Sequence, residues 1–352
     1  MSTAISLKSE GDRAYLDGFR PMSWGTGEMC EFASALTRML DCVGESVPYH
    51  YVLGVTGAAF RFTIGRELWN PGFYGFELVA EDYLDLIRRA FAAVGYAYDW
   101  HAKGDLADDA RRIRDSIGRG IAVMLRGNLV DASDWVLITG YEGNGERLYA
   151  SSTYGGGGDA PGGCAKVADW HGKTREYVIL GQRSERPRPA DVYAEALRLA
   201  VRLIRTGHIH GRHTGLAAYD ALAGALRQQD YPEHTPGKED DLWFRYLCIL
   251  CYQMMLDDHR SAPAFLRDAA NALPECESEL AEAAECYEHA CTLRDHLDDV
   301  IKGDFSEEAQ MAFRDPDVRE RYARVLLRIR DTDARAASHI EKALARGCRP
   351  AG

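Results

Sequence analysis

The sequence predicts an α+β protein with an N-terminal domain built around a central antiparallel sheet and an all-α C-terminal domain. Short apolar runs of strand length alternate with helical patterns up to residue 180. Beyond residue 189, apolar residues recur every three or four positions, as they do on amphipathic helices. Residues 183–189 between these parts are charged and contain two prolines, which is typical of a linker. We therefore expect one domain over residues 1–185 and a helical bundle over residues 190–352.

Composition limits the classes of function. A chain of 352 residues is long enough for two domains with sizeable cores. Its formal net charge of −12 disfavours nucleic acid and anionic membranes as partners. The sequence shows neither a transmembrane run nor an apolar secretory segment, and its nine cysteines are scattered and odd in number. We therefore expect a cytoplasmic protein with reduced thiols, no membrane or nucleic-acid partner, and no cofactor or metal.

In the first domain, residues 1–22 are expected to form an irregular lead-in. A helix should follow, because apolar residues recur at helical spacing from Phe32 onward, and it should end near Gly44. Small residues then predict a tight turn before a short strand that ends at Arg61. The rest predicts helices over residues 81–94 and 106–117, and strands over residues 96–100, 121–125, 135–141, 147–151 and 176–180.

The second domain is expected to be helical throughout. We find no fixed repeat period in it, so a bundle is favoured over a solenoid. The helices are expected over residues 193–204, 214–226, 240–257, 262–273, 278–300 and 316–344, the second of them beginning with a threonine cap.

The stretch that suggests chemistry surrounds Cys30. Residues 23–36 (SWGTGEMCEFASAL) place this cysteine at the start of a helix, after a loop punctuated by glycines. Unpaired N–H groups and the positive end of the helix dipole lie at a helix start, and both stabilise a thiolate. Cys30 is therefore a candidate nucleophile. The alternative is a buried structural cysteine, because burial is the commonest fate of this residue type.

Other motifs are explained by structure rather than by chemistry. Cys248 and Cys251 form a C-x-x-C inside an apolar helical run, without the second ligand pair of a zinc site. The three histidines within residues 208–213 do not match one face of a helix. Residues 257–260 (DDHR) lie at a helix junction, where charge and capping account for them. The glycine-rich tract 154–163 lacks the Lys-Ser/Thr ending of a phosphate loop.

A helix-start cysteine, further helices and then a hairpin with residues 135–141 as its first arm follow the order of a papain-like fold. On these residues the first half of the chain resembles the cysteine peptidase-like domains of bacteriocin leader-processing transporters. It also resembles the N-terminal domain of butirosin biosynthesis protein H and related acyltransferases. Residues 134–142 (DWVLITGYE) are similar to the strand that carries the catalytic histidine in these families. Residues 57–61 (GAAFR) and 215–220 (GLAAYD) resemble an uncharacterised bacterial group.

The resemblance implies a papain-like domain with Cys30 as nucleophile, but the sequence departs from the pattern at the other two catalytic positions. Asp134 stands where the resemblance implies the histidine. Ser151 and Ser152 stand where it implies the Asp or Asn that orients this histidine. A carboxylate with a pKa near 4 is a weak base, and its negative charge disfavours a neighbouring thiolate. Peptidase activity is therefore not expected.

Two functions remain, and the first is a binding protein on a peptidase scaffold that has lost its activity, a pseudoenzyme. A small ligand would lie in a cleft beside Cys30. Trp24, Trp135 and Tyr141 would supply aromatic walls. Glu28 or Arg61 would supply charge, although Arg61 is equally suited to a structural ion pair.

The second function is a thiol-dependent acyltransferase or amide hydrolase. Cys30 would take an acyl group from a donor, and the backbone N–H groups of residues 28–30 would stabilise the oxyanion. Asp134, in the catalytic role, would orient the acceptor or remove its proton. His50, His101 and His171 lie in the same domain, although none lies on the expected strand. Under either function the helical domain offers a surface for a homodimer.

Overall fold

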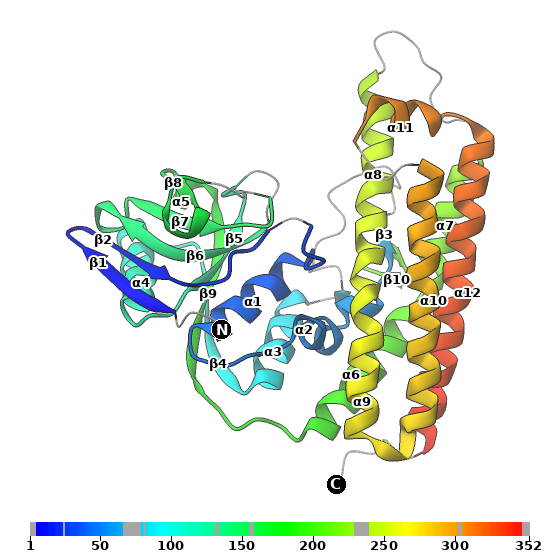
Figure 1. The fold of residues 1–352 in the computed structure, drawn as a ribbon, viewed down its shortest axis with the longest axis horizontal. Helices are drawn as coiled ribbons and strands as arrows, with labels where there is room; N and C mark the ends of the chain where they lie inside the picture. The colour runs from blue at the N-terminus through cyan, green and yellow to red at the C-terminus, as the bar shows by residue number, and fades with distance from the viewer. Residues whose placement is uncertain are drawn as a thin grey trace. The chain divides into compact units, whose positions relative to one another are not determined.

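The computed structural model describes residues 5–23, 25–65, 79–80, 82–130, 134–154, 158–228, 239–301 and 305–346. It is an α+β protein, with an antiparallel sheet in the N-terminal part and helices in the C-terminal part (Figure 1). The chain divides into two compact units. The first unit is Met1–Val52 with Ala90–Arg186, and the second is Leu53–Arg89 with Pro187–Gly352. Residues 53–89 thus group with the helical part, whereas the sequence led us to expect them in the first domain.

An antiparallel sheet forms the centre of the first unit. Its strands follow the order β1-β2-β6-β5-β9-β4, with β7 paired to β6 and β8 paired to β7. The strands are β1 Ser6–Glu10, β2 Arg13–Asp17, β4 Tyr96–Ala102, β5 Val123–Gly127, β6 Trp135–Glu142, β7 Arg147–Ser151, β8 Ala165–Val167 and β9 Thr174–Arg183.

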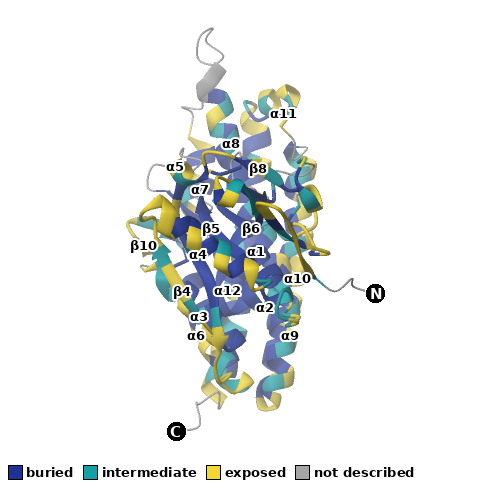
Figure 2. Cartoon of the chain, turned by 90° about the vertical axis from the view of Figure 1, so that its left-hand side faces the viewer, coloured by how far each residue is buried: buried dark blue, intermediate teal, exposed yellow. Residues whose placement is uncertain are grey.

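Two helices of this unit frame the sheet, α1 (Glu31–Asp41) and α4 (Leu106–Gly118), and a short α5 (Trp170–Lys173) precedes β9. Helix α1 contacts β5 and β6, and all of its residues from Glu31 to Leu40 are buried. Strand β5 and residues 135–140 of β6 are likewise buried, as their dark colour in Figure 2 shows. The core of the first unit therefore lies between α1 and the middle of the sheet.

The prediction of an irregular lead-in over residues 1–22 is wrong, because β1 and β2 form a hairpin there. Strand β2 alternates as a half-buried strand should, with Ala14 and Leu16 buried between more exposed neighbours. Only two buried residues carry this alternation, and β1 is exposed along its whole length, so the sequence pattern was too short to recognise.

The expected tight turn and strand before Arg61 are also wrong. Residues Tyr49–Thr56 form helix α2, and a 3-10 helix, η1 (Ala58–Phe60), follows it. Short apolar runs fit a strand and a buried helix equally well, so periodicity could not decide. The division between the units falls within α2, and again within α3 (Tyr83–Val94).

Long helices build the second unit, and α10 packs along both α9 and α12. The apolar period of three to four residues predicted these helices, with ends displaced by a few residues, except for the six-residue α11, which was not predicted. They are α6 Pro189–Arg205, α7 Leu216–Arg227, α8 Glu239–Asp257, α9 Ala262–Ala272, α10 Glu277–Ile301, α11 Glu307–Ala312 and α12 Pro316–Arg346, with the 3-10 helices η5 Asp258–Ser261 and η6 Pro274–Cys276.

A small sheet explains why residues 53–89 belong to this unit. Strand β3 (Thr63–Ile64) pairs with β11 (Arg212–Thr214), which pairs in turn with β10 (His208–Ile209). His210 and Gly211 both have positive φ at the β10–β11 turn, as a tight two-residue hairpin requires. Thr214 is therefore a strand residue rather than the predicted cap, and α7 begins after Gly215.

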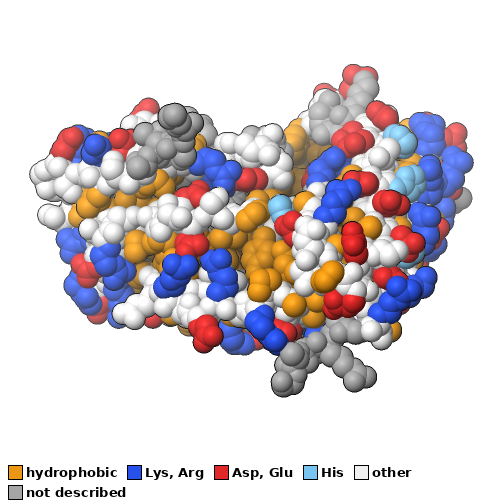
Figure 3. All heavy atoms as spheres, turned by 60° about the horizontal axis from the view of Figure 1, so that its bottom comes forward, with side chains coloured by type: hydrophobic (Ala, Val, Ile, Leu, Met, Phe, Trp, Pro, Cys, Tyr) orange, Lys and Arg blue, Asp and Glu red, His pale blue; other side chains and the backbone are white. Residues whose placement is uncertain are grey.

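On one face of the molecule, charges of the two signs lie side by side (Figure 3). On the face shown in Figure 3, basic and acidic side chains are interspersed. The excess of acidic residues in the sequence therefore does not form a single acidic field on this face.

Candidate functional site around Cys30

Cys30 caps the helix that it was expected to begin. Helix α1 starts at Glu31, and Cys30 has an extended backbone conformation at the N-cap position, one residue earlier than predicted. The Cys30 carbonyl accepts a hydrogen bond from the Ser34 N–H at 3.0 Å, which closes the first helical turn. The Cys30 N–H donates to the hydroxyl of Tyr49 at 2.8 Å. The residue as a whole is 6% exposed.

Glu31 joins the start of α1 to the start of β6. Its Oε2 accepts hydrogen bonds from the backbone N–H groups of Asp134 at 2.7 Å and Trp135 at 3.0 Å. Beside this contact, the ring of Phe32 meets the ring of Trp135 edge to face, with centroids 5.3 Å apart. The Glu31 carboxylate therefore links the start of α1, where Cys30 lies, to the start of β6, which Asp134 precedes.

The carboxylate of Asp134 pairs with arginine. Oδ2 lies 2.9 Å from Nε of Arg126, and Oδ1 lies 3.8 Å from a guanidinium nitrogen of Arg175. Arg126 also lies 3.4 Å from Glu176, whose other oxygen accepts a hydrogen bond from the Trp100 indole at 3.1 Å. Charges of both signs therefore surround the start of β6.

Strand register explains how these residues meet. Arg126 on β5 is the cross-strand partner of Trp135 on β6 and of Glu176 on β9. Directly opposed residues of an antiparallel pair project to the same face, so these three side chains form a row across the sheet. Arg126 and Glu176 could not be predicted as site residues from the sequence, since pairing partners up to 50 residues apart leave no local signal.

Glu28 lies in a second ion-pair group just before α1. It contacts Arg20 at 2.8 Å and Arg38 at 2.7 Å, and the Arg38 side chain is 1% exposed. Burial alone would raise the pKa of Glu28, but the hydrogen bonds and charges of the two arginines outweigh it and lower the pKa. Glu28 is therefore held by the protein's own arginines.

The remaining predicted ligand contacts do not gather at Cys30. Tyr141 lies at the far end of β6, six residues or about 20 Å beyond Trp135, and pairs with Ala14 and Leu148. Arg61 belongs to the second unit, where its guanidinium pairs with Asp258 at 3.0 Å and both side chains are buried. Trp24 lies outside the described residues.

The three histidines of the first domain have different surroundings. His50 follows Tyr49 on α2, so its side chain points about 100° away from that of the residue that bonds Cys30. His101 on β4 lies against the ring of Tyr177, with centroids 5.0 Å apart, and burial lowers its pKa. His171 on α5 contacts Asp109 on α4, with Nε2 and Oδ2 3.2 Å apart.

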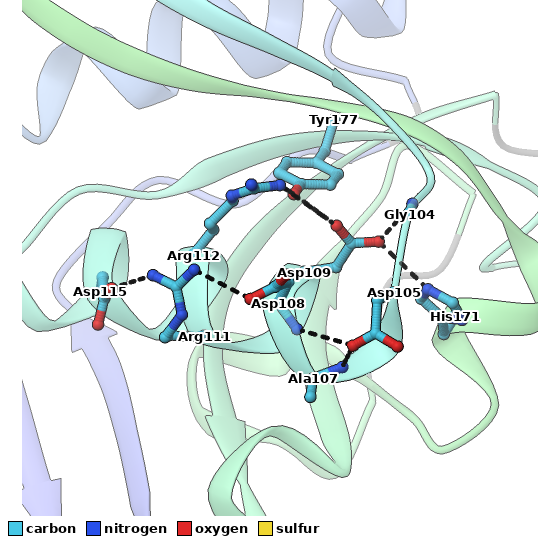
Figure 4. Close-up of polar contacts among 10 residues, drawn as sticks. All are labelled: Gly104, Asp105, Ala107, Asp108, Asp109, Arg111, Arg112, Asp115, His171 and Tyr177. Atoms are coloured by element: carbon cyan, nitrogen blue, oxygen red, sulfur yellow. Dashed lines mark hydrogen bonds and ion pairs between the residues drawn. The ribbon is translucent and has the colours of Figure 1, made fainter.

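Asp109 is the centre of a second polar cluster of this unit (Figure 4). The fully buried carboxylate accepts hydrogen bonds from the Gly104 N–H and the Tyr177 hydroxyl, both at 2.8 Å. Because a carboxylate accepts, Nε2 of His171 carries the proton toward it. Burial alone would raise the pKa of Asp109, but these hydrogen bonds outweigh it and lower the pKa. Tyr177 has its pKa raised to about 12, by burial first and by Asp109.

The described part of the chain contains neither a candidate metal site nor a candidate membrane-spanning helix. No group of three or more His, Cys, Asp or Glu side chains there is placed to hold a metal ion. Among the described helices, none combines the length and apolar character that a bilayer crossing requires.

The chain matches no protein-family model and no curated protein sequence.

Proposed function

We propose that the first unit binds a small ligand beside Cys30 and does not act as a cysteine peptidase. The pairing of Asp134 with Arg126 supports this proposal most directly. In the papain-like arrangement that the sequence resembles, this position supplies the base for the thiol. Here it holds an acidic side chain whose oxygens lie against two guanidinium groups.

The Cys30 backbone supports the same reading. Acyl transfer through a cysteine uses N–H groups near the nucleophile to stabilise the oxyanion. The Cys30 N–H is engaged by the Tyr49 hydroxyl at 2.8 Å, so it is not turned toward a substrate. At the position where the resemblance implies the base stands an acidic residue, and one of the expected oxyanion donors is engaged by Tyr49, which supports binding over peptidase chemistry.

The surroundings of Cys30 suggest the kind of ligand. Arg126 and the carboxylates of Glu31, Asp134 and Glu176 provide charges of both signs, whereas the predicted aromatic wall Trp135 is buried against Phe32 and offers no free ring face. A small molecule with both amino and carboxylate groups complements such a set. Amino acids and their amides are therefore the first probes.

Thermal unfolding in the presence of single amino acids and amides tests binding. At least one probe is expected to raise the Tm of the wild-type chain, because a ligand that binds the native state stabilises it. Asp134→Asn should abolish that rise. Asp99→Asn, on the exposed face of β4 in the same unit, is the matched control and should retain it. No rise with any probe, or an equal rise in both variants, would contradict the proposal.

Iodoacetamide labelling separates the proposal from thiol-dependent acyl transfer, the alternative. We expect Cys30 in the folded protein to be labelled at pH 7 no faster than Cys42, because Cys30 is nearly inaccessible. Burial raises the pKa of Cys42 to about 11, so it is a slow reference thiol of the same unit. Labelling of Cys30 more than ~10-fold faster than Cys42, absent in Cys30→Ser, would indicate an activated thiolate and favour the acyltransferase.

The proposed homodimer through the helical part stays a prediction. Sedimentation of the purified chain at several concentrations measures it directly, and a monomer at all of them would contradict it.

A further inference from the structure

The core of the second unit holds a group of buried polar side chains that the proposed function does not use. His259 lies on η5, in the DDHR segment that capping was expected to explain. It is 1% exposed, Asp333 on α12 is 2% exposed, and Tyr219 on α7 and Tyr287 on α10 are fully buried. Four separate elements of the unit therefore each contribute one polar group to its interior.

The contacts show that these side chains are neighbours. The Tyr219 hydroxyl donates to Oδ2 of Asp333 at 2.7 Å. The ring of Tyr287 meets the ring of His259 at nearly a right angle, with centroids 5.5 Å apart. Nδ1 of His259 lies 3.8 Å from Oδ1 of Asp333. His259 is therefore a neighbour of both Tyr287 and Asp333.

One contact fixes the proton on His259. Its Nε2 lies 3.0 Å from the carbonyl oxygen of Arg61. A carbonyl oxygen can only accept, so Nε2 carries the hydrogen. In the neutral ring, Nδ1 then presents a lone pair and accepts hydrogen bonds.

Three atoms of this group have no hydrogen-bond partner within the described part of the chain: Nδ1 of His259, Oδ1 of Asp333 and the hydroxyl oxygen of Tyr287. The 3.8 Å between Nδ1 and Oδ1 exceeds the 2.7–3.2 Å range of a hydrogen bond. Buried polar atoms are almost always bonded, either to protein or to ordered water. Three unbonded atoms on neighbouring side chains therefore point to a shared partner.

The donors and acceptors of the three atoms identify that partner. A neutral imidazole nitrogen and a carboxylate oxygen both accept, whereas a tyrosine hydroxyl can donate. A water molecule donates two hydrogen bonds and accepts others, so a single one has the donors and the acceptor that these three atoms require. We propose that the helical unit contains an internal binding site for one water molecule, which donates to His259 and Asp333 and accepts from Tyr287.

The competing arrangement is a direct ion pair. A proton on Nδ1 and a small shift of either side chain would bond His259 to Asp333 without any third molecule. That arrangement leaves the hydroxyl of Tyr287 buried and unbonded, which the water site does not. The two arrangements therefore predict opposite effects of removing that hydroxyl.

Tyrosine-to-phenylalanine variants of the full chain make this test. Removing a buried hydroxyl that bonds water should lower Tm, whereas removing an unbonded one should raise it or leave it unchanged. We expect Tyr287→Phe to lower Tm by about 1–3 °C. Tyr219→Phe is the positive control, because its hydroxyl bonds Asp333 in either arrangement. An unchanged or higher Tm for Tyr287→Phe, with a lower one for Tyr219→Phe, would overturn the proposal.

A crystal structure of the full chain provides a second, direct readout. The expected result is one isolated density peak of a single oxygen atom within hydrogen-bond distance of Nδ1, Oδ1 and the Tyr287 hydroxyl. A direct bond between Nδ1 and Oδ1 with no such peak would overturn the proposal. So would density for a larger molecule on these atoms.

Discussion

Arg126 carries two ion pairs at the start of β6, with Asp134 at 2.9 Å and Glu176 at 3.4 Å, while 10% of its side chain is exposed. Removing one partner from a buried pair leaves an uncompensated charge. We expect Arg126→Ala to lower the free energy of unfolding by about 3–5 kcal/mol, measured by urea denaturation at pH 7.

Arg175→Ala is the matched control for this prediction, because Arg175 faces the same Asp134 from a distance of 3.8 Å with a side chain 59% exposed. An exposed pair contributes about 0–1 kcal/mol, so this variant should lose little. Equal losses of unfolding free energy in the two variants would show that the buried ion pairs of Arg126 contribute no more to stability than the exposed pair of Arg175.

The Asp109 carboxylate predicts a pH-dependent contribution to stability. Its folded-state pKa is depressed, so the ionised form is favoured by folding above the pKa of an unfolded aspartate, about 3.9. This stabilisation is lost as the pH falls through the depressed folded pKa. The free energy of unfolding of Asp109→Asn should therefore be below that of the wild type at pH 7, and the gap should narrow below about pH 4.

Urea unfolding of both chains between pH 7 and pH 3 measures this gap. Asp108→Asn is the control, since Asp108 is the next residue on α4 but lies on the surface, paired with Arg111. A gap for Asp109→Asn that stays constant with pH would show that the carboxylate's charge does not contribute.

For single residues, the sequence predicted where each lies in its helix or strand but not which residues it contacts. The helical spacing after Cys30 correctly placed it at a helix start, and Asp134 does precede a strand, as expected. The contacts that define their chemistry come from far along the chain. Glu31 bonds Trp135 across 104 residues, and Asp109 bonds Tyr177 across 68. Such contacts depend on how the sheet assembles, which no local pattern encodes.

Helix α2 owes its packing to a glycine. A Cβ added at Gly54 would overlap the ring of Phe265 on α9, so only glycine fits against that ring. Gly54→Ala should lower the free energy of unfolding by about 1–3 kcal/mol, because a packed core does not accept an extra methyl group without displacement.

Gly224 on α7 supplies the opposite case in the same unit. It is exposed, and an added Cβ would meet nothing within 4 Å. Gly224→Ala should therefore raise the free energy of unfolding by about 0.5–1 kcal/mol through the lower entropy of the unfolded chain. Urea denaturation of both variants measures the two changes. A gain in both would indicate that helix propensity rather than contact with Phe265 decides, and a loss at Gly224 would contradict the expected stabilisation.

The same helix shows why some elements were predictable and others were not. The helices from α6 to α10 and α12 are long enough for several turns of apolar periodicity, and the sequence placed them correctly, whereas the six-residue α11 was not predicted. Helix α2 has eight residues with buried side chains over most of its length, so no polar face marks its period. Strands β1 and β2 are five residues each, too short for alternation to be distinguished from chance.

For the whole molecule, the α+β class followed from the order of patterns along the chain, because strand-length runs precede residue 180 and helices follow residue 189. The grouping of residues 53–89 with the helices did not follow, since it rests on contacts distant in sequence. Thr63 and Thr214 are paired across 151 residues, and Arg61 and Asp258 across 197. The order of patterns along the chain therefore predicts the type of each element better than it predicts which unit a segment belongs to.

The cysteines of the whole chain predict its redox behaviour. The eight that the structure describes are all unbridged. Burial raises the pKa of Cys164 to about 11 and those of Cys248 and Cys251 to about 12, so few of these thiols are ionised at neutral pH. Thiolates rather than thiols react with disulfide reagents. The folded protein should therefore react slowly with Ellman's reagent at pH 7, and the chain unfolded in guanidinium should release chromophore equivalent to its nine cysteines.

Because no disulfide joins the described cysteines, dithiothreitol should leave Tm unchanged, and a Tm that falls on reduction would contradict the absence of a disulfide among them.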